Sequence, residues 1–169
     1  RPVSVPMTES SGFRLTPEQL EDAITPRTRA LILCSPSNPT GAVYSEAEIK
    51  ALAGVLAGRE MHIISDEVYE KMVYGSGRHV SISTVSDEMA ARTIVVNSCS
   101  KTYAMTGWRV GYGLFPDELV EPVTRLVTNS VSCTAAFSQM AAVAAIEAPQ
   151  ASVLSMVAEF KRRRDIIVA

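Results

Sequence analysis

Three short apolar runs, each followed at once by a polar segment, limit the folds open to this chain more than any other feature. They cover residues 30–34, 61–65 and 93–97, and a more alternating run covers 109–115. Runs of this length, bounded by turn residues, are typical of strands buried on both faces of a parallel sheet. Because a helical pattern separates the first two, we expect an α/β domain with a mostly parallel sheet and helices on both faces, a three-layer α/β/α arrangement.

The expected helices are marked by their capping residues. A hydroxyl cap, a proline and a glutamine in residues 16–19 predict a helix over about 17–24. Residues 45–48 form a second capping box, and apolar residues at helical spacing continue from it to Gly58. Further helices are expected at about 118–127 and 135–147.

Both ends of the sequence are expected to be internal to a longer polypeptide. The chain opens at Arg1 without a methionine, and the helical periodicity of residues 149–169 runs to the last residue without a glycine cap. We therefore expect the core of one domain over residues 1–148. Residues 149–169 would form the start of a long helix that leads to an absent smaller domain.

The net charge and composition of the chain indicate which kinds of molecule it binds. A net charge of −2 and a pI near 5.7 argue against nucleic acid or an anionic membrane surface, since both favour a basic excess. No apolar stretch approaches the ~20 residues of a membrane helix, and no secretory signal opens the chain, so we expect a soluble, cytoplasmic protein. No metal site is expected, because His62 and His79 lack ligand-type company in the sequence and the three cysteines lie far apart.

The polar chemistry of the chain lies directly after the predicted strands. Residues 35–41 follow the first strand, residues 66–69 the second, and residues 98–101 the third. In open α/β sheets, ligands bind outside the carboxyl ends of the strands. The three segments are therefore expected to meet around one small ligand.

Taken singly, each polar residue in these segments has an ordinary explanation. The run Asn38-Pro39-Thr40-Gly41 favours a turn, Asp66 could cap a helix, and Tyr69 could be an aromatic at the edge of the core. Lys101 and Arg109 could be solvated surface charges, as most lysines and arginines are. All of these residues together, in this order along the chain, are much less likely to occur by chance than any one of them alone.

In these stretches the chain resembles the class I and II aminotransferases and their relatives among the fold-type I pyridoxal-phosphate enzymes. The matching motifs are SPSNPTG at 35–41, SDEVYE at 65–70 and SCSKTYAMTGWRVGYG at 98–113. Within the family the chain looks most similar to the bacterial aspartate-type enzymes. The resemblance implies the large cofactor-binding domain of that fold, pyridoxal 5′-phosphate as cofactor, and a homodimer in the full-length protein. It also implies amino transfer between an L-amino acid and a 2-oxo acid.

The resemblance assigns catalytic roles to Lys101, Asp66 and Tyr69, and a cofactor-binding role to Asn38. Lys101 matches the amine that holds the cofactor's aldehyde and shuttles a proton. Asp66 matches the carboxylate that keeps the pyridine nitrogen protonated, so that electrons leaving the substrate's α-carbon have a sink. Tyr69 and Asn38 match hydrogen-bonding partners of the phenolic oxygen.

The cofactor's phosphate needs fixed donors and a cation. By resemblance these include Ser98, Ser100 and Arg109, and the planar fork of an arginine suits a dianion. We cannot assign three other family features to residues of this chain. They are further phosphate donors, an aromatic residue that stacks on the cofactor ring, and the arginine that binds the substrate carboxylate. The amino donor and the acceptor are therefore not identified by the sequence.

Two other functions remain open at this stage. One is a pyridoxal-phosphate lyase built on the same fold. The other is a transcription regulator whose sensor domain has this fold and binds the cofactor without turnover. Gene context discriminates between them, because a winged-helix domain encoded upstream favours the regulator and a complete C-terminal small domain favours the enzyme.

Overall fold

A four-stranded sheet lies at the centre of the computed structural model of this chain, which describes residues 1–75 and 77–169. The strands are β1 (Ala30–Cys34), β2 (His62–Asp66), β3 (Thr93–Ser98) and β4 (Gly111–Leu114), in the order β1-β2-β3-β4. The first three are parallel, and β4 runs antiparallel to β3. The predicted α/β class and mostly parallel sheet are confirmed, and each predicted strand end lies within two residues of the observed one.

The helices also follow the sequence signals where those signals are long enough. They are α1 (Pro17–Ala23), α2 (Glu46–Leu56), α3 (Asp87–Ala90), α4 (Cys99–Thr102), α5 (Asp117–Ser130), α6 (Ala136–Glu147) and α7 (Ala151–Val168). Both predicted capping boxes form, with the Thr16 and Ser45 side chains accepting from the third helical residue. The sequence did not predict α3 and α4, because four residues are too few to show a helical period.

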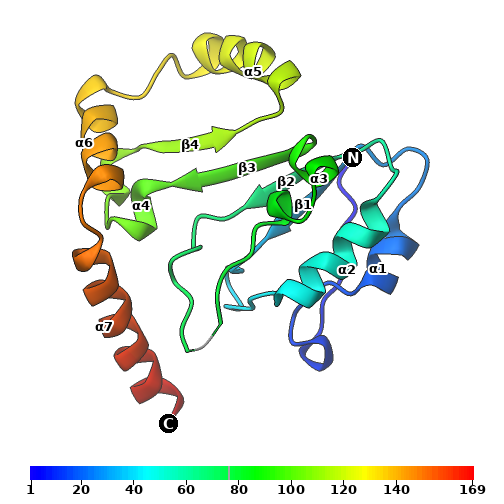
Figure 1. Cartoon of the computed structure of the whole chain (residues 1–169), viewed down its shortest axis with the longest axis horizontal. Coiled ribbons are helices and arrows are strands. Elements are labelled where there is room, and N and C mark those ends of the chain that lie inside the picture. The colour runs from blue at the N-terminus through cyan, green and yellow to red at the C-terminus, as the bar shows by residue number, and fades with distance from the viewer. Residues whose placement is uncertain (76) are drawn as a thin grey trace.

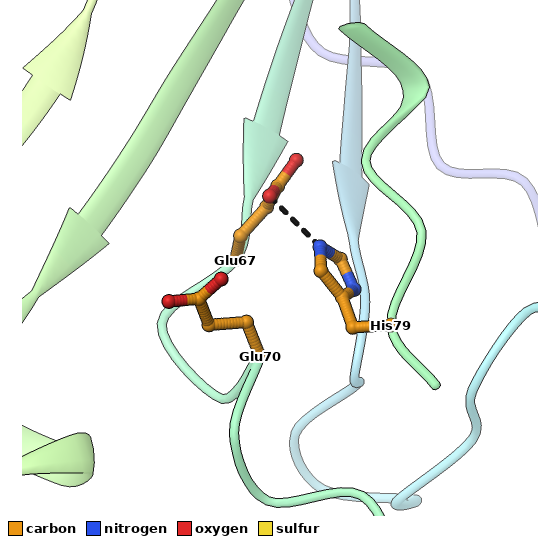
Figure 2. A group of neighbouring side chains, drawn as sticks. All are labelled: Glu67, Glu70 and His79. Atoms are coloured by element: carbon orange, nitrogen blue, oxygen red, sulfur yellow. Dashed lines mark hydrogen bonds and ion pairs between the residues drawn. The ribbon is translucent and has the colours of Figure 1, made fainter. Parts of the chain in front are cut away.

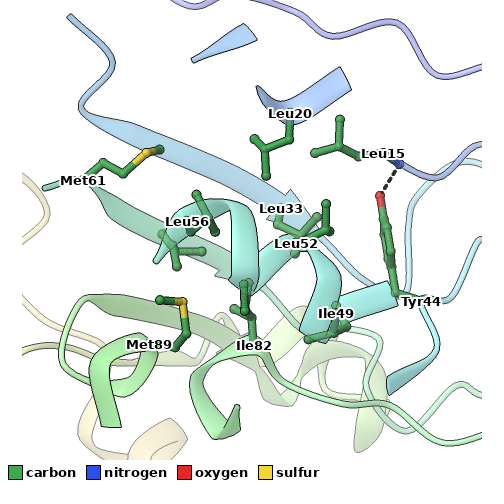
Figure 3. Packing of buried hydrophobic residues seen from close by; sticks show 12 residues of the cluster. Leu15, Leu20, Leu33, Tyr44, Ile49, Leu52, Leu56, Met61, Ile82 and Met89 are labelled. Atoms are coloured by element: carbon green, nitrogen blue, oxygen red, sulfur yellow. Dashed lines mark hydrogen bonds between the residues drawn. The ribbon is translucent and has the colours of Figure 1, made fainter. Parts of the chain in front are cut away.

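One apolar cluster packs α1 and α2 against a single face of the sheet (Figure 3). Leu33 of β1 and Ile63 of β2 meet Leu52 and Leu56 of α2, and both α2 leucines are fully buried. Burying one such side chain contributes about 1.5–3 kcal/mol. The cluster therefore fixes the strands whose ends carry the polar segments.

The opposite face of the sheet is open over β1 and β3 within the described residues. The register places Ile32, Ile64 and Ile94 in one row on this face, and the Ile32 side chain is 72% exposed. In Figure 1, α1 and α2 lie beside one another, whereas α5 lies beyond β4, and α6 and α7 run down one side of the molecule to the C-terminus. The second helical layer expected from the sequence is thus not formed over these strands in the part of the chain that the structure describes.

The last two helices are sharply bent relative to each other. The angle between α6 and α7 is 83°, and α6 packs through Ala142 against Cys99, Met105 and Val110. Of the apolar stripe on α7, Val153 is buried and Ile167 is exposed. The bend falls at the boundary predicted between residues 148 and 149, and the division into domains stays a prediction.

No single helix among the described residues is long and apolar enough to cross a membrane. Within the part of the chain that the structure describes, α6 and α7 taken together, across their 83° bend, do meet the length and composition of a span.

Candidate functional site

The carboxyl ends of β1, β2 and β3 lie at one edge of the sheet, as the parallel arrangement requires. Cys34 is paired in register with Asp66, and Asp66 with Val96, two residues before the end of β3. The three polar segments therefore leave the sheet side by side.

Asn38, Tyr69 and Lys101, one from each of these segments, form a contiguous group. The Asn38 Nδ2 donates a hydrogen bond of 3.4 Å to the Tyr69 hydroxyl oxygen. The Lys101 Nζ lies 5.7 Å from the centroid of the Tyr69 ring, within cation–π range. Within the described residues the Tyr69 hydroxyl accepts this bond but has no acceptor for its own proton, which leaves the proton available to a ligand.

Lys101 is distinguished from the other lysines by its lack of an acidic partner. The other three form ion pairs: Lys50 with Glu46 at 2.8 Å, Lys71 with Glu70 at 3.7 Å and Lys161 with Asp165 at 2.7 Å. Across residues 1–75 and 77–169, no carboxylate oxygen lies within 4.0 Å of the Lys101 Nζ. Its half-buried amine is therefore free for chemistry.

Asp66 is the last residue of β2, and its Oδ1 accepts a hydrogen bond of 3.3 Å from the Val68 backbone N–H. Burial raises the pKa of the neighbouring Cys34 thiol, the Asn38 backbone opposes this, and the Asp66 charge adds to the rise. Asp66 lies beside Cys34, the last residue of β1, in the register of the sheet. No cation pairs with the Asp66 carboxylate in the described part of the chain, so it is available to a protonated ligand nitrogen.

The two predicted serines lie where β3 passes into α4. Ser98 caps this short helix, and its Oγ accepts from the Ser100 backbone N–H at 3.0 Å. The same Oγ lies 2.9 Å from the Ser100 Oγ and 3.1 Å from the Val110 carbonyl oxygen. The two hydroxyls are therefore adjacent, and the backbone that follows Arg109 lies beside them.

The backbone around Arg109 is tightly constrained. Its φ of 53° lies in the left-handed region, and a Cβ at Gly111 would meet the Asn97 carbonyl oxygen at 3.0 Å, so only glycine fits easily there. The exposed guanidinium donates to the Thr106 carbonyl oxygen at 2.8 Å. The structure thus brings the Arg109 backbone close to Ser98, but in the described residues the guanidinium itself does not contact either serine.

Two open cavities flank this group. One of 950 Å³ reaches Tyr69 between the loop after β1, residues 69–74 and 77–80, and the end of α7. The other, of 670 Å³, lies beside Arg109, where the Trp108 and Phe137 rings meet edge to face at 6.2 Å. Lys101 and Asp66 are not among the described residues that line either one.

The chemical groups at this edge of the sheet match the groups of pyridoxal phosphate. The unpaired Lys101 amine suits an aldehyde, and the unpaired Asp66 carboxylate suits a protonated ring nitrogen. The Tyr69 hydroxyl, held by Asn38, suits a phenolic oxygen. The adjacent hydroxyls of Ser98 and Ser100 suit a phosphate.

The sequence showed no ligand-type neighbours for His79, but the structure places two carboxylates beside it. The His79 Nε2 lies 2.8 Å from the Glu67 Oε2, and Glu70 completes a group whose ligand atoms lie within 4.8 Å of one another (Figure 2). The pairing joins residues twelve positions apart, after the segment beyond β2 folds back. No local motif signals such a contact.

Comparison with known proteins gives consistent matches over the whole chain. Residues 1–169 match the family model described as aminotransferase class I and II. The chain is 46% identical over 166 residues to an aspartate aminotransferase of Geobacillus stearothermophilus, covering 98% of this chain and 42% of that protein. A probable aspartate/prephenate aminotransferase of Aquifex aeolicus is 43% identical, with 99% of this chain and 43% of that protein covered.

The fold matches solved structures equally well. The crystal structure of the aspartate aminotransferase from Rhizobium meliloti superposes with a TM-score of 0.92 at 44% identity, covering 95% of this chain and 40% of that one. The chain spans about two fifths of the length of the relatives it matches.

Proposed function

The chain belongs to the class I and II aminotransferase family, and we propose that the natural protein that carries it is an aminotransferase that exchanges an amino group between an L-amino acid and a 2-oxo acid. Enzymes of this family use pyridoxal phosphate. The observation that supports the proposal most is the unpaired Lys101 amine beside the Tyr69 ring, at the edge of the sheet where ligands bind.

The proposed catalytic roles follow from the chemistry of the side chains. When bound, the cofactor supplies an electron sink that makes the hydrogen on the substrate's α-carbon acidic. Lys101 would hold the cofactor through its amine and move the proton to and from that carbon. Asp66 would keep the ring nitrogen protonated, and Tyr69 with Asn38 would hydrogen-bond the phenolic oxygen.

The proposed phosphate donors are Ser98, Ser100 and Arg109. The adjacency of the two hydroxyls supports this role for the serines. For Arg109, the support is the backbone contact between Val110 and Ser98 together with the preference of guanidinium for phosphate.

The proposed amino donor is L-aspartate, because both curated relatives described above carry aspartate in their names. We further propose a homodimer in the cytoplasm. Apolar side chains exposed on α5 and α6, including Leu126, Phe137 and Met140, support association with a second subunit.

The test is amino transfer by the natural protein that carries this chain. Mixed with pyridoxal phosphate, L-aspartate and 2-oxoglutarate, it should form glutamate, and Lys101→Ala should abolish this turnover while Lys50→Ala should not. Products formed from the amino acid without a 2-oxo acid would favour a lyase. Cofactor binding without any product would favour a regulator.

A further inference from the structure

A buried carboxylate beside the candidate site has no part in the roles above. Glu67 directly follows Asp66, and its exposed fraction is only 3%. Successive residues of an extended chain point to opposite sides, so Glu67 shares its side with Ser65 while Asp66 points the other way. The two acidic neighbours therefore face different environments.

The Glu67 carboxylate is fully supplied with hydrogen-bond donors. Its Oε1 accepts from the Ser65 Oγ at 2.8 Å and from the Ser81 Oγ at 2.5 Å, and its Oε2 lies 2.8 Å from the His79 Nε2 (Figure 2). Burial raises the pKa of Glu67, but the hydrogen bonds from His79, Ser81 and Ser65 outweigh it, so the pKa lies below 4.5. An ionised carboxylate only accepts, and the His79 Nε2 must therefore carry a proton.

A cation site is the first alternative, because Glu70 brings a third ligand-type group close to Glu67 and His79. Both Glu67 oxygens already accept hydrogen bonds, and the nitrogen of His79 that faces them is protonated. In Figure 2 the one dashed contact among the three residues drawn joins His79 to Glu67, and Glu70 makes no drawn contact with either. The Glu67 oxygens and the His79 Nε2 are therefore engaged with hydrogen-bond partners and are not free to act as ligands.

The backbone of Glu67 links this hydrogen-bonded group to three parts of the site. Its N–H donates to the Val96 carbonyl oxygen at 2.9 Å, on the strand that leads to Lys101. Its carbonyl oxygen accepts from the Glu70 N–H at 2.9 Å, which closes the turn that carries Tyr69. Asp66 is covalently attached on the other side. Movement of Glu67 would therefore move both Asp66 and Tyr69.

We propose that Glu67 and His79 are positioning residues: their buried contact holds the end of β2 so that Asp66 and Tyr69 keep their places relative to Lys101. This inference rests on the proposed function. Catalytic groups must stay within a fraction of an ångström of their productive positions, and such precision comes from supporting side chains locked by hydrogen bonds.

The test compares Glu67→Gln and His79→Gln with His62→Gln in the natural protein that carries this chain. His62 is a matched control because it begins β2 and, like His79, has a buried Nδ1 without a hydrogen-bond partner in the described residues. Three quantities are measured: the cofactor dissociation constant, the pH midpoint of the bound cofactor's absorbance change, and the melting temperature of the cofactor-free protein. The pH midpoint reports on the positions of Asp66 and Tyr69 relative to the cofactor. A general loss of stability does not shift this midpoint.

We expect Glu67→Gln and His79→Gln to weaken cofactor binding by roughly tenfold or more and to shift the absorbance midpoint, with neither effect in His62→Gln. If Glu67→Gln does not fold, Ser81→Ala removes a single donor and should shift the midpoint less, in the same direction. A lowered melting temperature with an unchanged midpoint and dissociation constant would overturn the inference and leave the proposed function intact. A wild-type protein that binds no cofactor would overturn both.

Discussion

The chain up to β4 and the helices after it are held together in different ways. The first part has a large core between α1, α2 and the sheet, and every proposed site residue lies in this part of the chain. In the second part, the only buried members of α5, α6 and α7 among the described residues are Ser138, Ala142 and Val153. Amphipathic helices gain most of their stability from packing. The end of β2 that carries Asp66 is thus held by contacts within the first part, whereas the segment around Lys101 also depends on α6, because Cys99 packs against Ala142.

The largest effect that tests this comparison is a cavity in the first part. Leu52→Ala, on α2, should destabilise the chain by about 2–5 kcal/mol, because Leu52 is fully buried and its neighbours cannot close the space. Leu126→Ala, on α5, is the matched control and should change stability by less than about 0.5 kcal/mol, because its side chain is 67% exposed. Urea denaturation of this chain measures both, and equal losses would break the comparison.

A second effect concerns turnover rather than stability. Asp66→Ala should lower kcat by raising the activation free energy by about 3 kcal/mol, because the carboxylate acts most strongly when the cofactor ring accepts electrons. The cofactor dissociation constant should change much less. Asp165→Ala, on α7, is the control at an exposed carboxylate. Half-reaction rates within a few-fold of wild type, or roughly 1 kcal/mol, would show that Asp66 is not the partner of the ring nitrogen.

A smaller effect separates Arg109 from the arginines of α7. Arg109→Ala should weaken cofactor binding by roughly tenfold, since a hydrogen bond to a charged group contributes about 1.5–3 kcal/mol. Arg162→Ala should leave it unchanged, because Arg162 is exposed and pairs with Glu159 at 2.8 Å. Equilibrium titration with pyridoxal phosphate measures both constants, and equal values would refute the phosphate role of Arg109.

The smallest effect is a pH dependence that differs between the two parts. The folded-state pKa of Glu67 lies below its ordinary value of 4.5, so its contribution to stability is present above pH 4.5 and is lost as the pH falls through the folded-state pKa. Glu159 on α7 also has a lowered pKa, of about 2, caused by hydrogen bonds from Arg162 and Arg163. The Glu159 side chain is 41% exposed, so salt screens its interactions.

Denaturation across acid pH, at low and at high salt, measures this difference. Glu67→Gln should flatten the acid loss of stability at both salt concentrations, whereas Glu159→Gln should matter only at low salt. If salt removed the contribution of Glu67 as well, its carboxylate would not be sealed from solvent as the structure has it.

The sequence predicted those features that depend on local patterns. The strands and the capping boxes at Thr16 and Ser45 were predicted correctly because hydrophobic periodicity and helix capping depend on residues close together in the sequence. The closeness of Asn38, Tyr69 and Lys101 followed from the parallel sheet. These are the parts of fold and site that nearby residues determine.

Other features depend on contacts between distant residues, which no local pattern reports. The Glu67–His79 contact and the direction of the Arg109 guanidinium toward Thr106 are two of them. The exposure of Ile32 is a third, because the apolar sequence of a strand is the same whether or not helices pack on both of its faces.

The central claim is that Lys101 carries the cofactor. Borohydride reduction of the natural protein that carries this chain, loaded with pyridoxal phosphate, followed by peptide mapping, tests it directly. We predict the pyridoxyl group on the peptide that contains Lys101, and its loss in Lys101→Arg with native folding retained. Labelling of the ion-paired Lys50, Lys71 or Lys161 in place of Lys101 would contradict the account.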